Sequence, residues 1–154
     1  MNYKTLILLS LFNFLSYISL GQNIYPNKFG DCDTKMFGLE NDSITAKVNK
    51  QILVDVLTKG LDEKTLKNVS GILKIQIIAY TDNSSCMISY ENATNLTDEE
   101  LQIKMIKKTI DEELVWEEVP EAVSPMIEFF FLIDTINVKR IGFGGNKGFH
   151  ELVD

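Results

Sequence analysis

The side chains that could perform chemistry in this sequence are few and far apart. His150 is the only histidine, and it lies in a glycine-rich stretch near the end of the chain. A histidine that acts as a general base needs an orienting carboxylate and a nucleophile, and neither accompanies it in the sequence. Ser84 and Ser85 stand in a polar run typical of a turn, with no base nearby. We therefore expect His150 to be solvated and the protein not to be an enzyme.

An acidic cluster around Trp116 is the second candidate for chemistry. Carboxylates bind a cation where their oxygens converge, but the sequence has no Asp-x-Asp-x-Asp-Gly loop. A solvated acidic face is the simpler interpretation, and attraction of a cation or a basic partner is the functional one. We expect no metal and no cofactor. The acids are Asp111, Glu112, Glu113, Glu117, Glu118 and Glu121.

The two cysteines, Cys32 and Cys86, are a candidate disulfide. Together with one remote histidine they are too few for a metal site. In an oxidising compartment an even pair favours one bridge. Two separate thiols are the alternative, because a sequence does not show whether the Cβ atoms meet.

The first residues of the chain predict such a compartment. A positively charged start, an apolar run and the small residues in Ser19-Leu20-Gly21 are typical of a secretory signal peptide. We expect it to span residues 1–21, with cleavage before Gln22 and a periplasmic or secreted location. The alternative is a membrane anchor, but the run is short for a span and contains Asn13. We expect no stable membrane span in the mature form.

The composition describes one globular domain. The chain has 154 residues, of which 45% are hydrophobic and 24% charged, with a net charge of -7. That balance excludes a disordered acidic tail and a multi-pass membrane protein. The negative charge also argues against a nucleic-acid partner, because phosphate binding needs a basic surface.

The elements that would position these side chains begin with one helix in residues 22–60. Asn41 or Asp42 can cap it, and Gly60 is a natural stop. Apolar residues recur at helical spacing between these limits, which predicts a core-facing stripe. They are Ile44, Val48, Ile52, Leu53, Val56 and Leu57.

The region 61–140 predicts two strands, a helix and a strand. Residues 71–80 alternate, and Cys86, Ile88 and Tyr90 form the apolar face of a second strand, so the two make a hairpin. Thr97 and Glu100 match a capping box that opens a helix to about Glu113. The expected fold is therefore α+β: a ββαβ antiparallel sheet with a helix packed on one face, preceded by an additional N-terminal helix.

The last predicted strand, Met126 to Ile136, is the most apolar stretch after the signal peptide. Alternate residues, among them Phe129 and Phe131, share one face and are expected in the core. The other face carries Glu128, Phe130, Leu132 and Asp134. Residues 141–154 are rich in glycine and are expected to form a flexible tail.

Residues 70–136 resemble the C-terminal domain of TonB-type energy transducers. Ser70-Gly71 opens the long strand, Thr97-Asp98-Glu99-Glu100 begins the helix, and Trp116 with Pro120 is similar to the Trp-Pro loop before that family's last strand. The chain departs from the family in having only three prolines, and thus no long Pro-rich linker. The resemblance implies a periplasmic, non-enzymatic interaction module.

The resemblance implies that the module binds a segment of a partner protein. In the family this partner is an outer-membrane transporter. The segment adds as a strand to an exposed sheet edge. The resemblance implies that the last strand offers this edge, with Met126, Glu128, Phe130, Leu132 and Asp134 as the partner-binding residues. A central position for this strand is the structural alternative. The functional alternative is a secreted enzyme inhibitor, or an enzyme whose site the sequence does not reveal.

Overall fold

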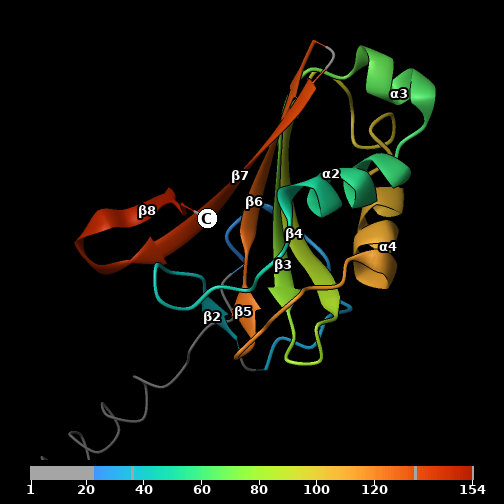
Figure 1. Ribbon diagram of the computed structural model, residues 1–154. Coiled ribbons are helices and arrows are strands. Elements are labelled where there is room, and N and C mark those ends of the chain that lie inside the picture. The colour runs from blue at the N-terminus through green and yellow to red at the C-terminus, as the bar shows by residue number, and fades with distance from the viewer. Residues whose placement is uncertain (1–22, 36, 134, 154) are drawn as a thin grey trace, which may run out of the picture.

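The computed structural model describes residues 23–35, 37–133 and 135–153, so the expected signal peptide lies outside the described residues. The strands form one mostly antiparallel sheet in the order β1-β4-β3-β6-β7-β8, with β2 and β5 attached beside β3 (Figure 1). The strands are β1 (Asn27–Lys28), β2 (Gly38–Leu39), β3 (Gly71–Ala79), β4 (Ser85–Thr94), β5 (Val123–Ser124), β6 (Met126–Leu132), β7 (Thr135–Gly144) and β8 (Gly148–Glu151). The helices are α2 (Lys50–Lys59), α3 (Glu63–Asn68), α4 (Ile103–Glu113) and the 3-10 turn η2 (Gly145–Lys147).

The predicted α+β class is confirmed. Helices α2 and α4 pack against each other and cover one face of the sheet (Figure 1). Apolar side chains of both helices and of the central strands form one buried cluster, because each element buries only one of its faces. The cluster includes Leu53, Leu57, Ile75, Ile106 and Phe129.

The first helix is shorter than the sequence predicts. It does not start near Asp42, because the chain is still extended at Lys47, whose amide donates to the carbonyl of Glu118 at 2.8 Å. Asn49 caps the helix instead, and Gly60 ends it as predicted. The apolar spacing before Asn49 therefore belongs to an extended segment that the sequence pattern does not distinguish from helix.

The predicted hairpin of β3 and β4 forms, but with an irregular register. The pairing shifts by one residue after Gln76. Met87 and Tyr90 consequently both pack on the cluster beneath the helices, whereas Ile88 is buried outside it. The prediction that Cys86, Ile88 and Tyr90 share one face is wrong, because a bulge interrupts the two-residue alternation on which it relied.

The capping box also forms, but it does not open α4 directly. The Thr97 amide donates to Glu100 at 2.9 Å, and the Glu100 amide donates to the Thr97 hydroxyl at 3.2 Å. Gln102 then adopts a left-handed backbone with φ 57°, so the continuous helix begins only at Ile103. The predicted helix is thus divided into one capped turn and α4.

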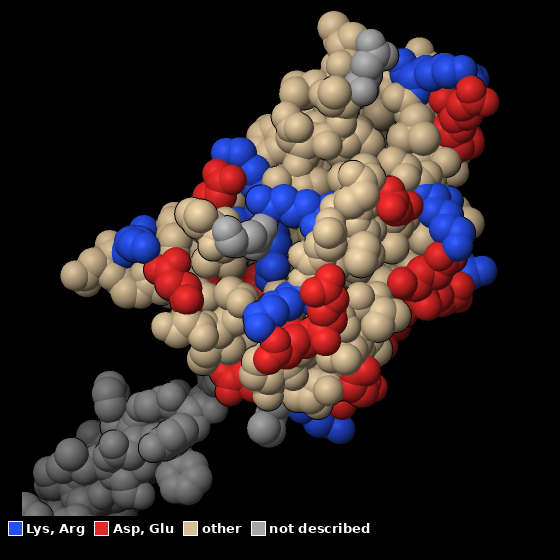
Figure 2. All heavy atoms as spheres, in the orientation of Figure 1, with Lys and Arg blue, Asp and Glu red and all other residues tan. Residues whose placement is uncertain are grey.

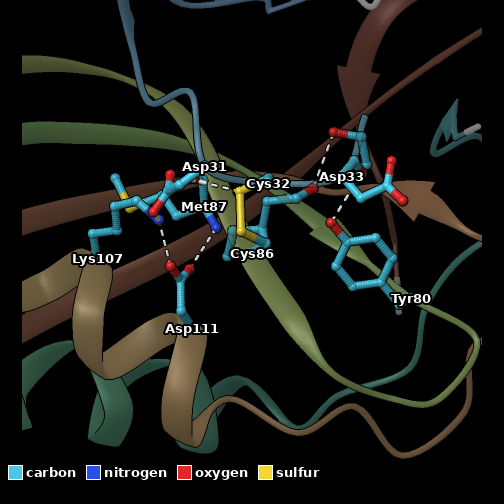
Figure 3. The surroundings of a disulfide bond; sticks show 10 residues. Asp31, Cys32, Asp33, Tyr80, Cys86, Met87, Lys107 and Asp111 are labelled. Atoms are coloured by element: carbon cyan, nitrogen blue, oxygen red, sulfur yellow. Dashed lines mark hydrogen bonds and ion pairs between the residues drawn. A yellow bond between two sulfur atoms is a disulfide. The ribbon is translucent and has the colours of Figure 1, made fainter. Parts of the chain in front are cut away.

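The segment ahead of β2 is fastened to the outer edge of β4. β1 pairs with Ser89 and Tyr90 there. Cys32 and Cys86 form a disulfide with their Cα atoms 5.9 Å apart, which confirms the bridge. Figure 3 shows that Lys107 of α4 reaches this segment, with its Nζ 3.0 Å from a carboxylate oxygen of Asp31.

Lys107 joins the segment to α4. Its ammonium pairs with Asp31 and with Asp111, and it lies 5.1 Å from the ring centroid of Phe29. Burial alone lowers the pKa of Lys107, but the hydrogen bonds to the two carboxylates outweigh it and raise the pKa. The lysine is therefore held charged in a site that is largely shielded from water.

The C-terminal part departs most from the sequence-based expectation. β6 is hydrogen-bonded to β3 on one edge and to β7 on the other. The strand predicted as the free edge is thus central, and strand addition there is excluded because its main-chain groups are already paired. The predicted flexible tail, 141–154, instead contributes the end of β7, η2 and β8.

Removal of the disulfide is expected to destabilise the fold by about 4 kcal/mol, the loop-closure value for its sequence separation of 54 residues. The test is urea unfolding of a Cys32→Ser/Cys86→Ser double variant. Wild-type protein in reducing buffer is the control and should lose the same stability. A double variant within about 0.5 kcal/mol of the oxidised wild type would contradict the assignment.

Candidate functional site

Two of the predicted partner-binding residues, Glu128 and Phe130, lie on the face of the sheet that the helices leave uncovered. They alternate with the core residues of β6 and so point to the opposite face, whereas Leu132 is exposed at the end of the strand. Met126 is buried at the start of the strand, and Asp134 lies outside the described residues. That these side chains bind a partner stays a prediction; the structure shows only that they do not border an open edge.

An open edge does occur on the next strand. β7 pairs with β6 from Thr135 to Ile141, but β8 covers its other side only from Ile141 to Gly144. No strand within the described residues pairs with the outer side of Thr135–Lys139. In Figure 1 this is the upper half of β7, above the point where β8 branches away.

The direction of the main-chain groups along this edge follows from one hydrogen bond. The amide of Leu152 donates to the carbonyl of Arg140 at 2.9 Å on the outer side. Because main-chain groups in an antiparallel ladder alternate between the two sides, those of Val138 and Ile136 also face outward. The edge therefore offers two outward-facing residues, and their side chains pack partly against the core.

A groove runs beside this edge on the helix-covered face. One hollow of about 390 Å³ lies between α2 and the open part of β7, and includes Gln51, Val54 and Val138. A larger, more apolar cleft of about 620 Å³ continues toward α3 and the β6–β7 turn. The two share Val54 and Ile136, so they adjoin along the strand edge, and together they are called the groove.

The surface of this region is unevenly charged. Figure 2 shows it mainly uncharged between the β6–β7 turn at the top and α2, with acidic and basic side chains at its flanks. Two flanking charges, Lys139 and Glu151, pair at 2.7 Å, and Glu151 raises the pKa of that lysine. Leu132 and Ile133 at the turn are exposed by 53% and 93%. Large apolar side chains thus border the upper end of the groove.

A buried ion pair marks the lower end of the open edge. Glu40 is fully buried and Arg140 is 3% exposed, and their side chains are bonded to each other. Glu40 also accepts from the amide of Ala46 at 2.7 Å, and the Arg140 guanidinium lies 5.6 Å from the Trp116 ring. Such a pair is stable only where hydrogen bonds offset the lost hydration, and the amide and carbonyl of Ala46 supply two of them here.

The residues that could have supported catalysis have structural roles. Ser85 begins β4 and is buried, accepting from the Trp116 indole at 2.8 Å and donating to the carbonyl of Leu114 at 2.7 Å. Ser84 is bonded to Asp82 within the turn, as predicted. His150 lies in β8 rather than in a flexible tail, and its side chain is only 15% exposed.

The acidic cluster does not converge on one point. Asp111 accepts from the amide of Met87, while Glu113 and Glu118 form ion pairs with lysines on separate segments. Among residues 23–35, 37–133 and 135–153, no group of three or more His, Cys, Asp or Glu side chains could hold a metal ion. Within the same ranges, no helix is long and apolar enough to cross a membrane.

The open edge was missed because the last strand was expected to end at Ile136, and residues 137–140 were assigned to no strand. A signal was available: Ile136 and Val138 alternate with Thr135, Asn137 and Lys139, which is typical of a half-buried strand.

Comparison of the chain with known protein families, with curated proteins and with solved structures found no match.

Removal of one partner of the buried ion pair is expected to cost roughly 3–5 kcal/mol, because it leaves the other charge buried without its partner. Arg140→Met tests this by urea unfolding. Glu40→Gln/Arg140→Met removes both charges and keeps an acceptor for the Ala46 amide, so it should recover at least half of the loss. A double variant no more stable than Arg140→Met would refute the interpretation.

The contact between His150 and Asp42 is expected to depend on pH. A hydrogen bond to the Gly148 carbonyl raises the pKa of His150 above 6.5, and Asp42 contributes further. The contribution of the His150 contacts to the free energy of unfolding is full below about pH 6.5, and it is lost as the pH rises through the folded-state pKa of His150. Lys147 and then His150 lower the pKa of Asp42 below 3.8, so its contribution is present above that pH and lost on further acidification.

NMR titration of the imidazole measures this directly, since the chain has one histidine. The folded protein should titrate above the value of the urea-unfolded control. Asp42→Asn should remove part of the difference, because the Gly148 carbonyl remains. Identical midpoints in folded and unfolded protein would show that the contact does not form.

Proposed function

We propose that this protein is an exported, non-enzymatic interaction module that binds an extended segment of a partner protein by strand addition. The site is the outer edge of β7 over Thr135–Lys139. The observation that carries the proposal is that this stretch of strand has no strand partner among the described residues and is bordered by a groove. Main-chain groups along such an edge can hydrogen-bond to an added strand.

The partner that we propose is a segment of an outer-membrane transporter. The support for this is the resemblance of residues 70–136 to the C-terminal domain of TonB-type transducers, together with the element order β3, β4, α4 and, after the two-residue β5, β6. The disulfide supports an exported location, since disulfides persist in oxidising compartments. The edge used is β7 rather than the strand that the resemblance implies.

Strand addition at this edge can be tested by removing one main-chain donor, the amide hydrogen of Val138. The Val138 amide faces away from β6, so proline can replace this residue without removing a hydrogen bond of the sheet. Val138→Pro should keep the fold and weaken binding of an added strand at least about tenfold, because it removes a donor and places a ring on the edge. Val138→Ala is the matched control, since it shortens the side chain and keeps the amide hydrogen.

The measurement is NMR titration with a short synthetic peptide in which threonine and valine alternate. Wild type and Val138→Ala should show amide shifts and slowed hydrogen exchange at Ile136 and Val138 or its replacement. Val138→Pro should show neither effect along the edge. If the peptide left the β7 amides of wild type unchanged, or bound Val138→Pro as tightly, strand addition at this edge would be wrong.

A further inference from the structure

The apolar cleft at the upper end of the groove has a lining that suits one kind of side chain. Its apolar members include Val54, Leu66, Val69, Phe131, Leu132 and Ile136, and its uncharged polar members are Thr58, Asn68, Ser70 and Thr135. Its charged lining residues, Glu63 and Lys67, pair with each other at 2.7 Å. A charged side chain entering this cleft would lose hydration and would have to compete with this exposed pair for a counter-ion. An uncharged apolar side chain would gain from the burial.

The position of the cleft relative to the edge determines which part of an added strand reaches it. Directly paired residues of neighbouring strands point to the same face of a sheet. A residue opposite Ile136 would thus point to the helix-covered face, where Ile136 lines the cleft. The residue opposite Val138 would face the smaller hollow, whereas the one between them would face solvent beside Asn137.

We propose, on the basis of the proposed strand addition, that the partner segment alternates apolar and polar residues and places a leucine-sized aliphatic side chain opposite Ile136, in this cleft. The main chain of β7 would accept any extended segment, so the cleft supplies the selection. A second copy of this chain is a poorer occupant, because each copy carries a net charge of -7. The occupant is therefore a segment of a different protein.

The experiment compares two synthetic peptides in wild-type protein. Both alternate threonine with a second residue: leucine in one peptide, and serine in the other. Isothermal titration calorimetry should give a dissociation constant at least about tenfold lower for the leucine peptide than for the serine peptide. This is the effect of burying one such side chain. Intermolecular NOEs from its leucine methyl groups to Val54 and Ile136 should place a side chain in the cleft.

One substitution in the cleft and one outside it complete the test. Val54→Thr keeps the shape of the residue shared by both hollows but adds a hydroxyl, and should weaken the leucine peptide at least about threefold without affecting the serine peptide. Val115→Thr is the matched control, since Val115 is 61% exposed and lines neither hollow. It should leave both affinities unchanged.

The outcomes separate this inference from the function on which it rests. If both peptides shift the β7 amides and bind equally, the cleft does not select, although strand addition stands. If the leucine peptide contacts Val54 but binds Val138→Pro as tightly as wild type, the cleft binds side chains without strand addition. If neither peptide affects β7 or the cleft, both proposals are wrong.

Discussion

A buried ion pair fixes the place where β7 stops following β6 and begins to follow β8. Arg140 precedes the last β6–β7 pair, and its guanidinium is held by Glu40. The carbonyl of Glu40 accepts from the Phe143 amide at 2.7 Å, so the same loop binds β7 twice. The approach is close: a Cβ on Gly142 would lie 3.1 Å from the carbonyl oxygen of Glu40. These contacts determine where β7 leaves β6 and pairs with β8, and this point sets the length of the open edge.

The arrangement of the layers determines what that edge can do. Because α2 and α4 cover only one face of the sheet, an added strand would meet a different environment on each side. On the helix-covered side its residues would face the groove beside Ile136 and Val138, which are only partly buried. On the other side they would lie beside polar residues such as Asn137. An amphipathic segment therefore matches the edge better than a uniformly apolar or polar one.

The sequence predicts those parts of the fold that local patterns encode. The strand over Gly71–Ala79, the capping box and the helical stop at Gly60 are all in place because each depends on neighbouring residues. The bulge in β4 and the left-handed backbone of Gln102 are not predictable in this way, since each depends on tertiary packing and has no signature in the alternation of apolar and polar residues. Strand order is likewise set by long-range pairing. For that reason the resemblance implied a free edge on β6, whereas among the described residues it is part of β7 that has no strand on its outer side.

Recognition by this protein must come from side chains if strand addition is its mode of binding. Main-chain hydrogen bonds at the edge are the same for every extended segment, and each contributes a modest net free energy because water competes for the same groups. The acidic net charge can steer a basic partner from a distance, but salt screens that attraction beyond about 10 Å. The cleft, whose two charged lining residues pair with each other, acts only on contact and depends little on salt. Under the proposed strand addition, a segment would therefore be selected by the residue that it can bury beside Val54, after the edge has aligned it.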